Sequence, residues 1–454
     1  MKKLPFFLFL ALAAMLPSCA GKSPDTSASA EISETVSSTE TAGITETTEI
    51  TETENTETDT SAAATEAETT VNETETTTEK MSEKITEKAT ERMTDKITET
   101  VTEKITEKVT EKVTEAVTEV PVVLPAQNGT VFVNGRTGIY NYCPSVMQSG
   151  DGTRYLYYCT NKDSNKVIDY IGFRIGTPDK GGNYTYGAET LVLSPTAGSW
   201  DSVHTCDPSV IKGKFKYKGE TYSYLMAYLG CSTTNNQDNK IGLAVAMTPG
   251  GPFTKVGDKP FIDFERDASA DTFQWGVGQP SLVSRDKGGK VWLFYTRGDK
   301  YGTATYVEEW NLSDLGSPIC ERSAVKLSES GLVDLNGGAD LINNADFAFD
   351  PTSKIFYASS DCHPNPSDAP DFISSDFRVT SFTGSFSVGQ WKTVGQAGAS
   401  ATGAARNHNT GIVRSEYGHL ADPRVLCVYY TVSVTGSQSL WSYRLHDYYF
   451  DLTK

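Results

Sequence analysis

The fold of this chain is decided by three short runs of sequence: DPSVIKGK from Asp207, SYLMAYLG from Ser223 and IGLAVAM from Ile241. Each run is rich in residues that favour β-structure, and turn-forming residues separate one run from the next. The pattern therefore predicts a small antiparallel sheet whose first strand opens at the Asp-Pro pair.

The same pattern recurs, so that residues 121–454 contain five similar units. The other four open with CPSVMQSG at Cys143, QPSLVSRD at Gln279, DFAFDPTS at Asp346 and NTGIVRSE at Asn409, at intervals of 63 to 72 residues. Five units of three or four strands predict an all-β protein, a five-bladed β-propeller. Two β-sandwiches are the alternative, but they would show two repeats. Residues 130–134 are expected to close the ring, and third strands are predicted at residues 170–174, 241–247, 306–311, 372–380 and 440–445.

The residues before the repeats have a different composition. Residues 20–120 hold 25 of the 58 acidic side chains, only 9 of the 40 basic ones, and no aromatic residue. Such a segment cannot bury a core, so we expect a disordered or weakly helical Thr/Glu/Lys-rich linker. The excess of acid also argues against binding of nucleic acid, which needs a basic face.

Residues 1–19 have the features of an export signal. Lys2 and Lys3 precede an apolar run too short to span a bilayer, which ends in Leu-Pro-Ser-Cys at Cys19. This ending resembles a bacterial lipobox, so Cys19 is expected to carry the lipid; an ordinary secretory signal is the alternative. We therefore expect a lipid-anchored protein on the outer side of the cell membrane, with no other membrane contact.

The unit that opens at Asp207 also resembles a known family. Its DPSV motif, its Tyr-rich strand and the run IGLAVA…GPF ending at Phe253 are similar to glycoside hydrolase family 43 and its five-bladed relatives. The resemblance covers residues from about 130 to 454. It implies inverting hydrolysis of oligo- or polysaccharides by three acids at one mouth of a central tunnel. Asp207 matches the acid that orients the proton donor, whereas Cys143 and Gln279 replace the base and the donor.

These replacements leave two hypotheses open. The first is a surface-exposed glycoside hydrolase, arabinofuranosidase- or xylosidase-like, and the second is a tethered propeller that binds glycans without cleaving them. For the enzyme, the predicted catalytic residues are Asp207, Asp346 and His204, with His204 as proton donor beside Asp207. The predicted substrate-binding residues are Tyr142, Trp200, Trp275, Gln279, Arg406 and Asn409.

No cofactor is required by this chemistry. His408 matches loosely a family histidine that helps to hold calcium through water molecules, so a calcium ion in the tunnel is an alternative. For both His204 and His408, a structural role is the competing interpretation. A monomer is expected.

Seven cysteines remain once Cys19 is set aside, so they cannot all pair. Their spacing suggests neither a zinc site nor a redox motif. Cys143 and Cys206 would open neighbouring units near the tunnel, which makes a bridge between them one interpretation, and free buried thiols are the other.

Overall fold

The computed structural model describes residues 122–234 and 237–454. The predicted signal peptide and linker lie outside these residues. Within them the regular structure is nearly all β-strand, and the two helical segments, α2 (Ala399–Thr402) and η1 (Ser439–Ser442), have four residues each. No described helix has the length and hydropathy needed to cross a bilayer.

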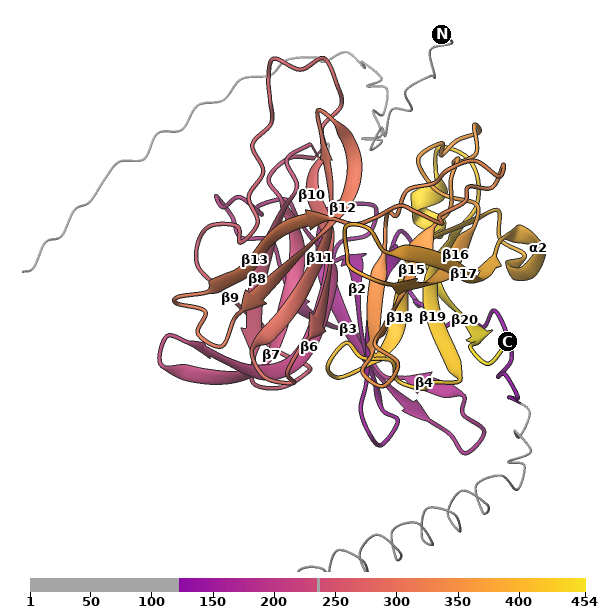
Figure 1. Cartoon of the computed structure of the whole chain (residues 1–454), viewed down its shortest axis with the longest axis horizontal. Helices are drawn as coiled ribbons and strands as arrows, with labels where there is room; N and C mark the ends of the chain where they lie inside the picture. Colours follow the sequence, from indigo (N-terminus) through magenta and orange to yellow (C-terminus); the bar gives the residue numbers. More distant parts are fainter. Residues whose placement is uncertain (1–121, 235–236) are drawn as a thin grey trace, which may run out of the picture. The chain divides into compact units, whose positions relative to one another are not determined.

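Three of the five predicted units form separate four-stranded antiparallel sheets, here called blades II, III and IV (Figure 1). In each blade the strands pair in sequence order. Blade II consists of β6 (His204–Tyr217), β7 (Glu220–Cys231), β8 (Lys240–Ala246) and β9 (Thr254–Lys255). Blade III consists of β10 (Gly276–Ser284), β11 (Lys290–Asp299), β12 (Gly302–Asn311) and β13 (Ile319–Lys326). Blade IV consists of β14 (Asp346–Asp350), β15 (Ile355–Asp361), β16 (Phe377–Thr383) and β17 (Gln390–Ala397).

Blades I and V share one sheet, because their innermost strands pair in parallel, with Val146 opposite Val413. Thr130 pairs antiparallel with His446, so the N-terminal segment closes blade V, as predicted. The predicted all-β five-bladed propeller is confirmed. Blade I consists of β1 (Asn141–Gln148), β2 (Arg154–Asn161), β3 (Asp169–Pro178), β4 (Tyr184–Tyr186) and β5 (Thr190–Leu193), and blade V of β18 (Arg406–Ser415), β19 (Val425–Ser433) and β20 (Arg444–Asp451).

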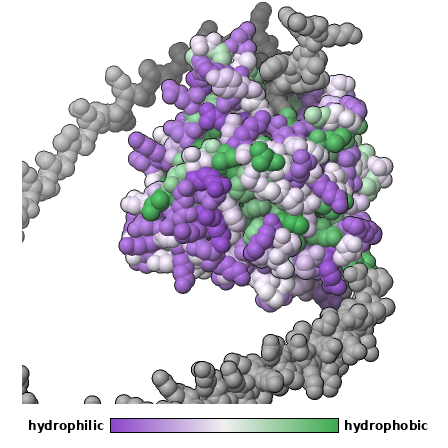
Figure 2. Space-filling view, viewed as in Figure 1, coloured by the Kyte–Doolittle hydropathy of each residue, from purple (hydrophilic) through white to green (hydrophobic). Residues whose placement is uncertain are grey.

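The core lies between the blades. Five clusters of buried apolar side chains fill the interfaces I–II, II–III, III–IV, IV–V and V–I. At the III–IV interface, the rings of Phe294 and Phe347 stack with their centroids 4.0 Å apart. The outer face in Figure 2 is mostly polar, and its apolar residues form small separate groups. Burial between blades thus accounts for the Tyr-, Phe- and Val-rich strands.

The predicted third strands are confirmed in blades I to III, where β3 and β12 cover them and β8 ends one residue earlier than predicted, at Ala246. In blades IV and V the strands begin later, at Phe377 and Arg444. The aromatic residues before them lie in two loops, 369–373 and 436–443, which line a cavity described below. The aromatic residues of these two loops therefore line a cavity and do not belong to strands.

Phe294 should contribute strongly to stability, because it is 1% exposed and joins two blades. We expect Phe294→Ala to lower the free energy of unfolding by about 3–5 kcal/mol, since a large cavity remains. Tyr301→Ala, at a site that is 84% exposed, should change it by less than about 0.5 kcal/mol. Urea titration measures both, and equal effects would argue against core packing between blades.

Candidate functional site

Five equivalent residues, one from each blade, have a left-handed backbone. Their φ angles lie between 44° and 53°, a region that side-chain-bearing residues rarely adopt. In blades I, II, III and V the pairing register with the next strand also shifts at this residue, which marks a β-bulge. These five positions, here called the bulge ring, are Cys143, Asp207, Gln279, Asn344 and Asn409.

The bulge ring surrounds the propeller axis. All five residues line a small cavity of about 40 Å³, and all five also line a larger cavity of about 770 Å³. Each ring residue is partly exposed although its strand neighbours are mostly buried. The left-handed backbone therefore places one side chain per blade at a shared space.

Asp346 does not belong to this ring. Asn344 occupies the blade IV position, so the predicted equivalence of Asp346 with Asp207 is corrected. Asp346 accepts a hydrogen bond from Ser281 Oγ at 2.7 Å and forms an ion pair with Arg414 Nη1 at 3.1 Å. It lines the small cavity but not the large one. The mistake arises because blade IV lacks the proline that follows the ring residue in blades I to III.

The larger cavity combines aromatic walls with carboxyl groups. Four aspartates line it, and among the described residues no Lys or Arg side chain does. Its loops 369–373 and 436–443 are tied together by a hydrogen bond of 2.7 Å from Gly436 N–H to the Ala369 carbonyl. Such a mixture of apolar walls and few polar groups is typical of small-molecule sites. The aromatic lining consists of Tyr140, Tyr142, Phe273, Trp275, Phe372, Trp441 and Tyr443.

Asp207 has an altered acidity. Burial raises the pKa of its carboxyl to about 6, although the Cys143 thiol and the Gln279 backbone N–H donate hydrogen bonds that oppose the rise. Gln279 also links Asp207 to the next ring residue, because its Oε1 accepts a hydrogen bond from the Asn344 N–H at 2.9 Å. Asp207 is therefore held by its neighbours in the ring.

Asp361 is a second carboxyl in the cavity, and the sequence analysis missed it. It ends β15 and is 2% exposed. Its oxygens accept hydrogen bonds from Asn344 Nδ2 at 2.7 Å and from the Asn409 N–H at 3.0 Å. Burial raises its pKa to about 7, against the opposing effects of these bonds and of the charges on His363 and Arg378. One sequence feature could have indicated Asp361: it is an acidic residue at the end of the apolar second strand of its blade.

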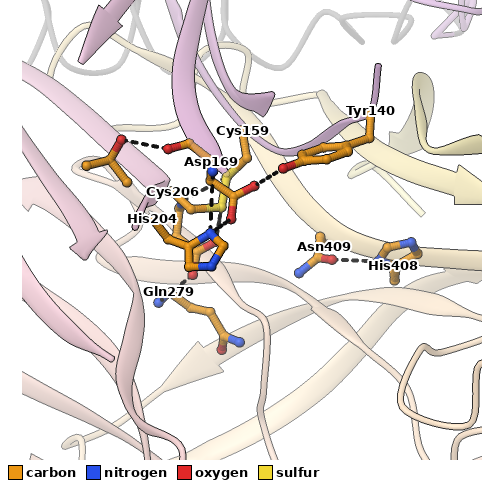
Figure 3. Close-up of a disulfide and its surroundings, with 10 residues drawn as sticks. Tyr140, Cys159, Asp169, His204, Cys206, Gln279, His408 and Asn409 are labelled. Atoms are coloured by element: carbon orange, nitrogen blue, oxygen red, sulfur yellow. Dashed lines mark hydrogen bonds and ion pairs between the residues drawn. A yellow bond between two sulfur atoms is a disulfide. The ribbon is translucent and has the colours of Figure 1, made fainter. Parts of the chain in front are cut away.

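His204 has a different partner from the one predicted. Its Nδ1 lies 2.7 Å from Asp169 Oδ2, and Tyr140 donates its hydroxyl to Asp169 Oδ1 at 2.7 Å (Figure 3). His204 is 1% exposed and does not line the larger cavity, whereas Asp169 does. The prediction that Asp207 orients His204 is corrected. Asp169, which begins β3, was not among the site residues predicted from the sequence.

The predicted substrate-binding residues fall into two groups. Tyr142, Trp275, Gln279 and Asn409 line the larger cavity. Trp200 instead stacks on Tyr228, and Arg406 is buried against Asp368 with a hydrogen bond of 2.8 Å; neither lines the small or the larger cavity. A position just before an inner strand is thus not enough to reach the site.

His408 lines the cavity as a buried imidazole. Burial lowers its pKa to about 4, so the ring is neutral at physiological pH. Its Nδ1 contacts Asn409 Oδ1, while Nε2 has no hydrogen-bond partner among the described residues. No cluster of three or more ligating side chains in residues 122–234 and 237–454 includes His408. Direct coordination of calcium, which needs six or more oxygens, does not fit these residues; a water-mediated calcium stays a prediction.

The described cysteines form one disulfide, between Cys159 and Cys206. This corrects the alternative that joined Cys143 to Cys206. Cys143 remains a free thiol, and burial and the neighbouring Asp207 carboxyl hold its pKa well above the usual range. The bridge joins the second strand of blade I to the first strand of blade II, directly beside Asp207.

The chain is thus a five-bladed β-propeller with an aspartate-lined cavity at one end of its axis. Neither a protein-family model nor a curated protein matches its sequence. Among solved structures it is similar to a family 117 glycoside hydrolase of Zobellia galactanivorans (14% identity, 71% of this chain, 87% of that chain, TM-score 0.45). It is also similar to a thermostable family-43 glycoside hydrolase (17% identity, 70% and 91%, TM-score 0.45). A third is an α-L-arabinofuranosidase of Podospora anserina (11% identity, 72% and 95%, TM-score 0.42).

The raised pKa of Asp361 should make stability depend on pH. An unfolded Asp titrates near pH 4, so the folded state holds this proton longer and its stability falls as pH rises from about 4 to about 7. We expect Asp361→Asn to stabilise the protein at pH 8 by on the order of 2–4 kcal/mol relative to its effect at pH 4. Asp371→Asn, at an exposed position of the same cavity, is the control for exchanging a carboxyl for an amide in urea unfolding. A pH-independent effect of Asp361→Asn would argue against a buried charge.

Proposed function

We propose that the larger cavity hydrolyses glycosidic bonds of oligo- or polysaccharides. The observation that carries the proposal is the pair Asp207 and Asp361, two carboxyls with raised pKa values in one aromatic-lined cavity. Glycoside hydrolysis needs one carboxyl that can donate a proton and one that can accept it.

In the proposed reaction Asp361 is the general acid. With a pKa of about 7 it retains a proton near neutral pH and can give it to the leaving oxygen. Asp207, with the lower pKa, is the general base that takes a proton from the attacking water. Gln279 and Asn344 separate the two carboxyls within the ring. Inversion needs carboxyls far enough apart to admit a water molecule between the acid and the base, and we propose this arrangement here. The reaction uses no cofactor.

The aromatic walls would bind the sugar. Trp275 and Phe273 lie in the segment before β10 of blade III, Trp441 and Tyr443 lie just before β20 of blade V, and Tyr142 lies in β1 of blade I. Aromatic faces pack against the C–H groups of sugar rings, and the amides of Gln279, Asn344 and Asn409 offer hydrogen bonds to hydroxyl groups. We propose pentose- or hexose-containing substrates of the arabino, xylo or galacto type.

We also propose that the propeller is displayed outside the cell as a monomer, anchored only through lipid on Cys19. The signal-like residues 1–19 and the Thr/Glu/Lys-rich residues 20–120 support this arrangement. A tether of this kind would hold an enzyme near polymeric substrates without further membrane contact.

Binding without turnover is the second candidate, because Cys143 and Gln279 stand where the family resemblance implies a base and an acid. Neither side chain can replace a carboxyl in that chemistry. Saturable binding of oligosaccharides with no cleavage by the native chain would favour this candidate over hydrolysis.

If Asp361 is the acid, turnover should fall as pH rises through about 7, since the proton to be donated is then lost. Asp361→Asn should lower kcat on an unactivated glycoside by about 10²–10⁴-fold, and by less on a 4-nitrophenyl glycoside, whose leaving group needs no proton. Asp314→Asn, an exposed carboxyl on the outer surface, serves as the control. Equal losses on both substrates would exclude Asp361 as the acid.

Trp441 should contribute binding energy to the sugar, because it lines the larger cavity. It lies in η1, between the strands β19 and β20. Trp441→Ala is expected to weaken oligosaccharide binding about tenfold, as measured by calorimetry in the Asp361→Asn background. Trp200→Ala removes the same side chain outside the cavity and should leave the affinity unchanged. The reverse pattern would place the sugar elsewhere.

A further inference from the structure

Three sulfur atoms and a carboxylate gather at the floor of the larger cavity. Cys143 Sγ, Cys159 Sγ, Cys206 Sγ and an oxygen of Asp207 all lie within 4.8 Å of one another. They come from three neighbouring strands, β1, β2 and β6. No other group of His, Cys, Asp and Glu side chains in the described residues brings three ligand atoms so close.

Apart from the bonded sulfurs of Cys159 and Cys206, these atoms are spaced nearly as in a metal site. In tetrahedral zinc coordination the Zn–S bonds are about 2.3 Å long, which places neighbouring sulfurs about 3.8 Å apart. Cys143 Sγ and the Asp207 oxygen lie at most 4.8 Å from the other ligand atoms. They would therefore need to move by roughly 1 Å or less to reach metal-binding distances. The Cys159 and Cys206 sulfurs must separate, and their Cα atoms are 5.1 Å apart on adjacent strands. Three sulfurs and one carboxylate complete a four-ligand set for zinc.

The surroundings of the cluster also suit a bound metal. Cys159 and Cys206 are 0% and 3% exposed, which excludes competing water, whereas Cys143 and Asp207 face the cavity, which gives a path in. The Asp207 backbone N–H points at Cys159 Sγ from 3.0 Å. Outer contacts of this kind stabilise a metal-bound thiolate.

We propose that reduction of the Cys159–Cys206 disulfide opens a binding site for a thiophilic divalent cation such as Zn²⁺, with Cys143, Cys159, Cys206 and Asp207 as ligands. A dithiol supplies the two electrons and two protons that convert the disulfide into two thiols, and is itself oxidised to a disulfide. Metal binding then releases the thiol protons to solvent. In an oxidising compartment the disulfide keeps the site closed.

This site is separate from the proposed hydrolysis but shares Asp207 with it. A carboxylate that coordinates a cation cannot accept a proton from water. The metal-bound, reduced protein should therefore lose any hydrolytic activity, while the oxidised protein should be insensitive to micromolar zinc. Metal binding is measured without any substrate, so its result tests the metal site independently of the proposed hydrolysis.

Cobalt(II) is the probe that tests the site, because thiolate coordination produces an intense near-ultraviolet absorption and tetrahedral geometry a visible band. The full-length chain, with Cys19 and the exposed Cys320 changed to Ser, is reduced without oxygen, freed of reductant and titrated. We expect one cobalt per chain in the reduced protein and none in the oxidised protein. Added Zn²⁺ should displace the cobalt and remove both bands.

Cys143→Ser provides the decisive variant, since it keeps the disulfide and removes only one ligand. It should reduce the near-ultraviolet band by about one third and weaken cobalt binding at least tenfold, more than loss of an outer contact would. Cys427→Ser, which changes a buried free thiol at the interface of blades V and I, should bind like the parent chain.

Three binding results would overturn the proposal, and one result on folding would do so as well. They are an absence of thiolate absorption in the reduced protein, equal cobalt affinity in the parent and Cys143→Ser, and equal binding in the oxidised and reduced forms. The near-ultraviolet circular dichroism of the metal-free reduced protein must also persist. Its loss would contradict the proposal too, because the site requires a folded reduced chain.

Discussion

The left-handed backbone at the bulge ring is the constraint on which the site depends. A positive φ at a residue with a side chain costs about 1–2 kcal/mol, and this chain adopts it at five equivalent positions. Such strain persists only where the surrounding structure over-determines it, and here the closed ring of sheets does so. In blades I, II, III and V a β-bulge at this position turns one polar or sulfur-bearing side chain out of the strand alternation and towards the axis, and in blade IV Asn344 has the same backbone conformation.

The crowding that follows explains the chemistry of the cavity. Asp207 and Asp361 are held away from bulk water, and the cavity lining in the part of the chain that the structure describes has no basic side chain, so their ionised forms are disfavoured. Backbone and amide N–H groups orient the carboxyls without neutralising them. The same convergence of inner strands places the Cys143 thiol beside the Cys159–Cys206 disulfide. Acidity and sulfur clustering thus have one structural origin.

The sequence predicted the architecture well because blade spacing and strand composition depend on local residues. It located four of the five ring positions for the same reason, since a strand-opening motif repeats around Cys143, Asp207, Gln279 and Asn409. It failed for Asn344, because the strand-opening motif is absent there and the prediction placed the ring position at Asp346, two residues later. Asp361 and the partnership of His204 with Asp169 depend on contacts between segments distant in sequence, which no local pattern encodes.

The central claim is that this cavity keeps a carboxyl protonated near neutral pH. The most direct measurement is a ¹³C NMR titration of the aspartate carboxyl groups, with Asp361 assigned by its absence from the Asp361→Asn spectrum. We predict that its carboxyl resonance titrates with a midpoint near pH 7, far above that of exposed aspartates. A midpoint below about 5 would contradict the claim, because Asp361 would then be fully ionised when a proton has to be donated.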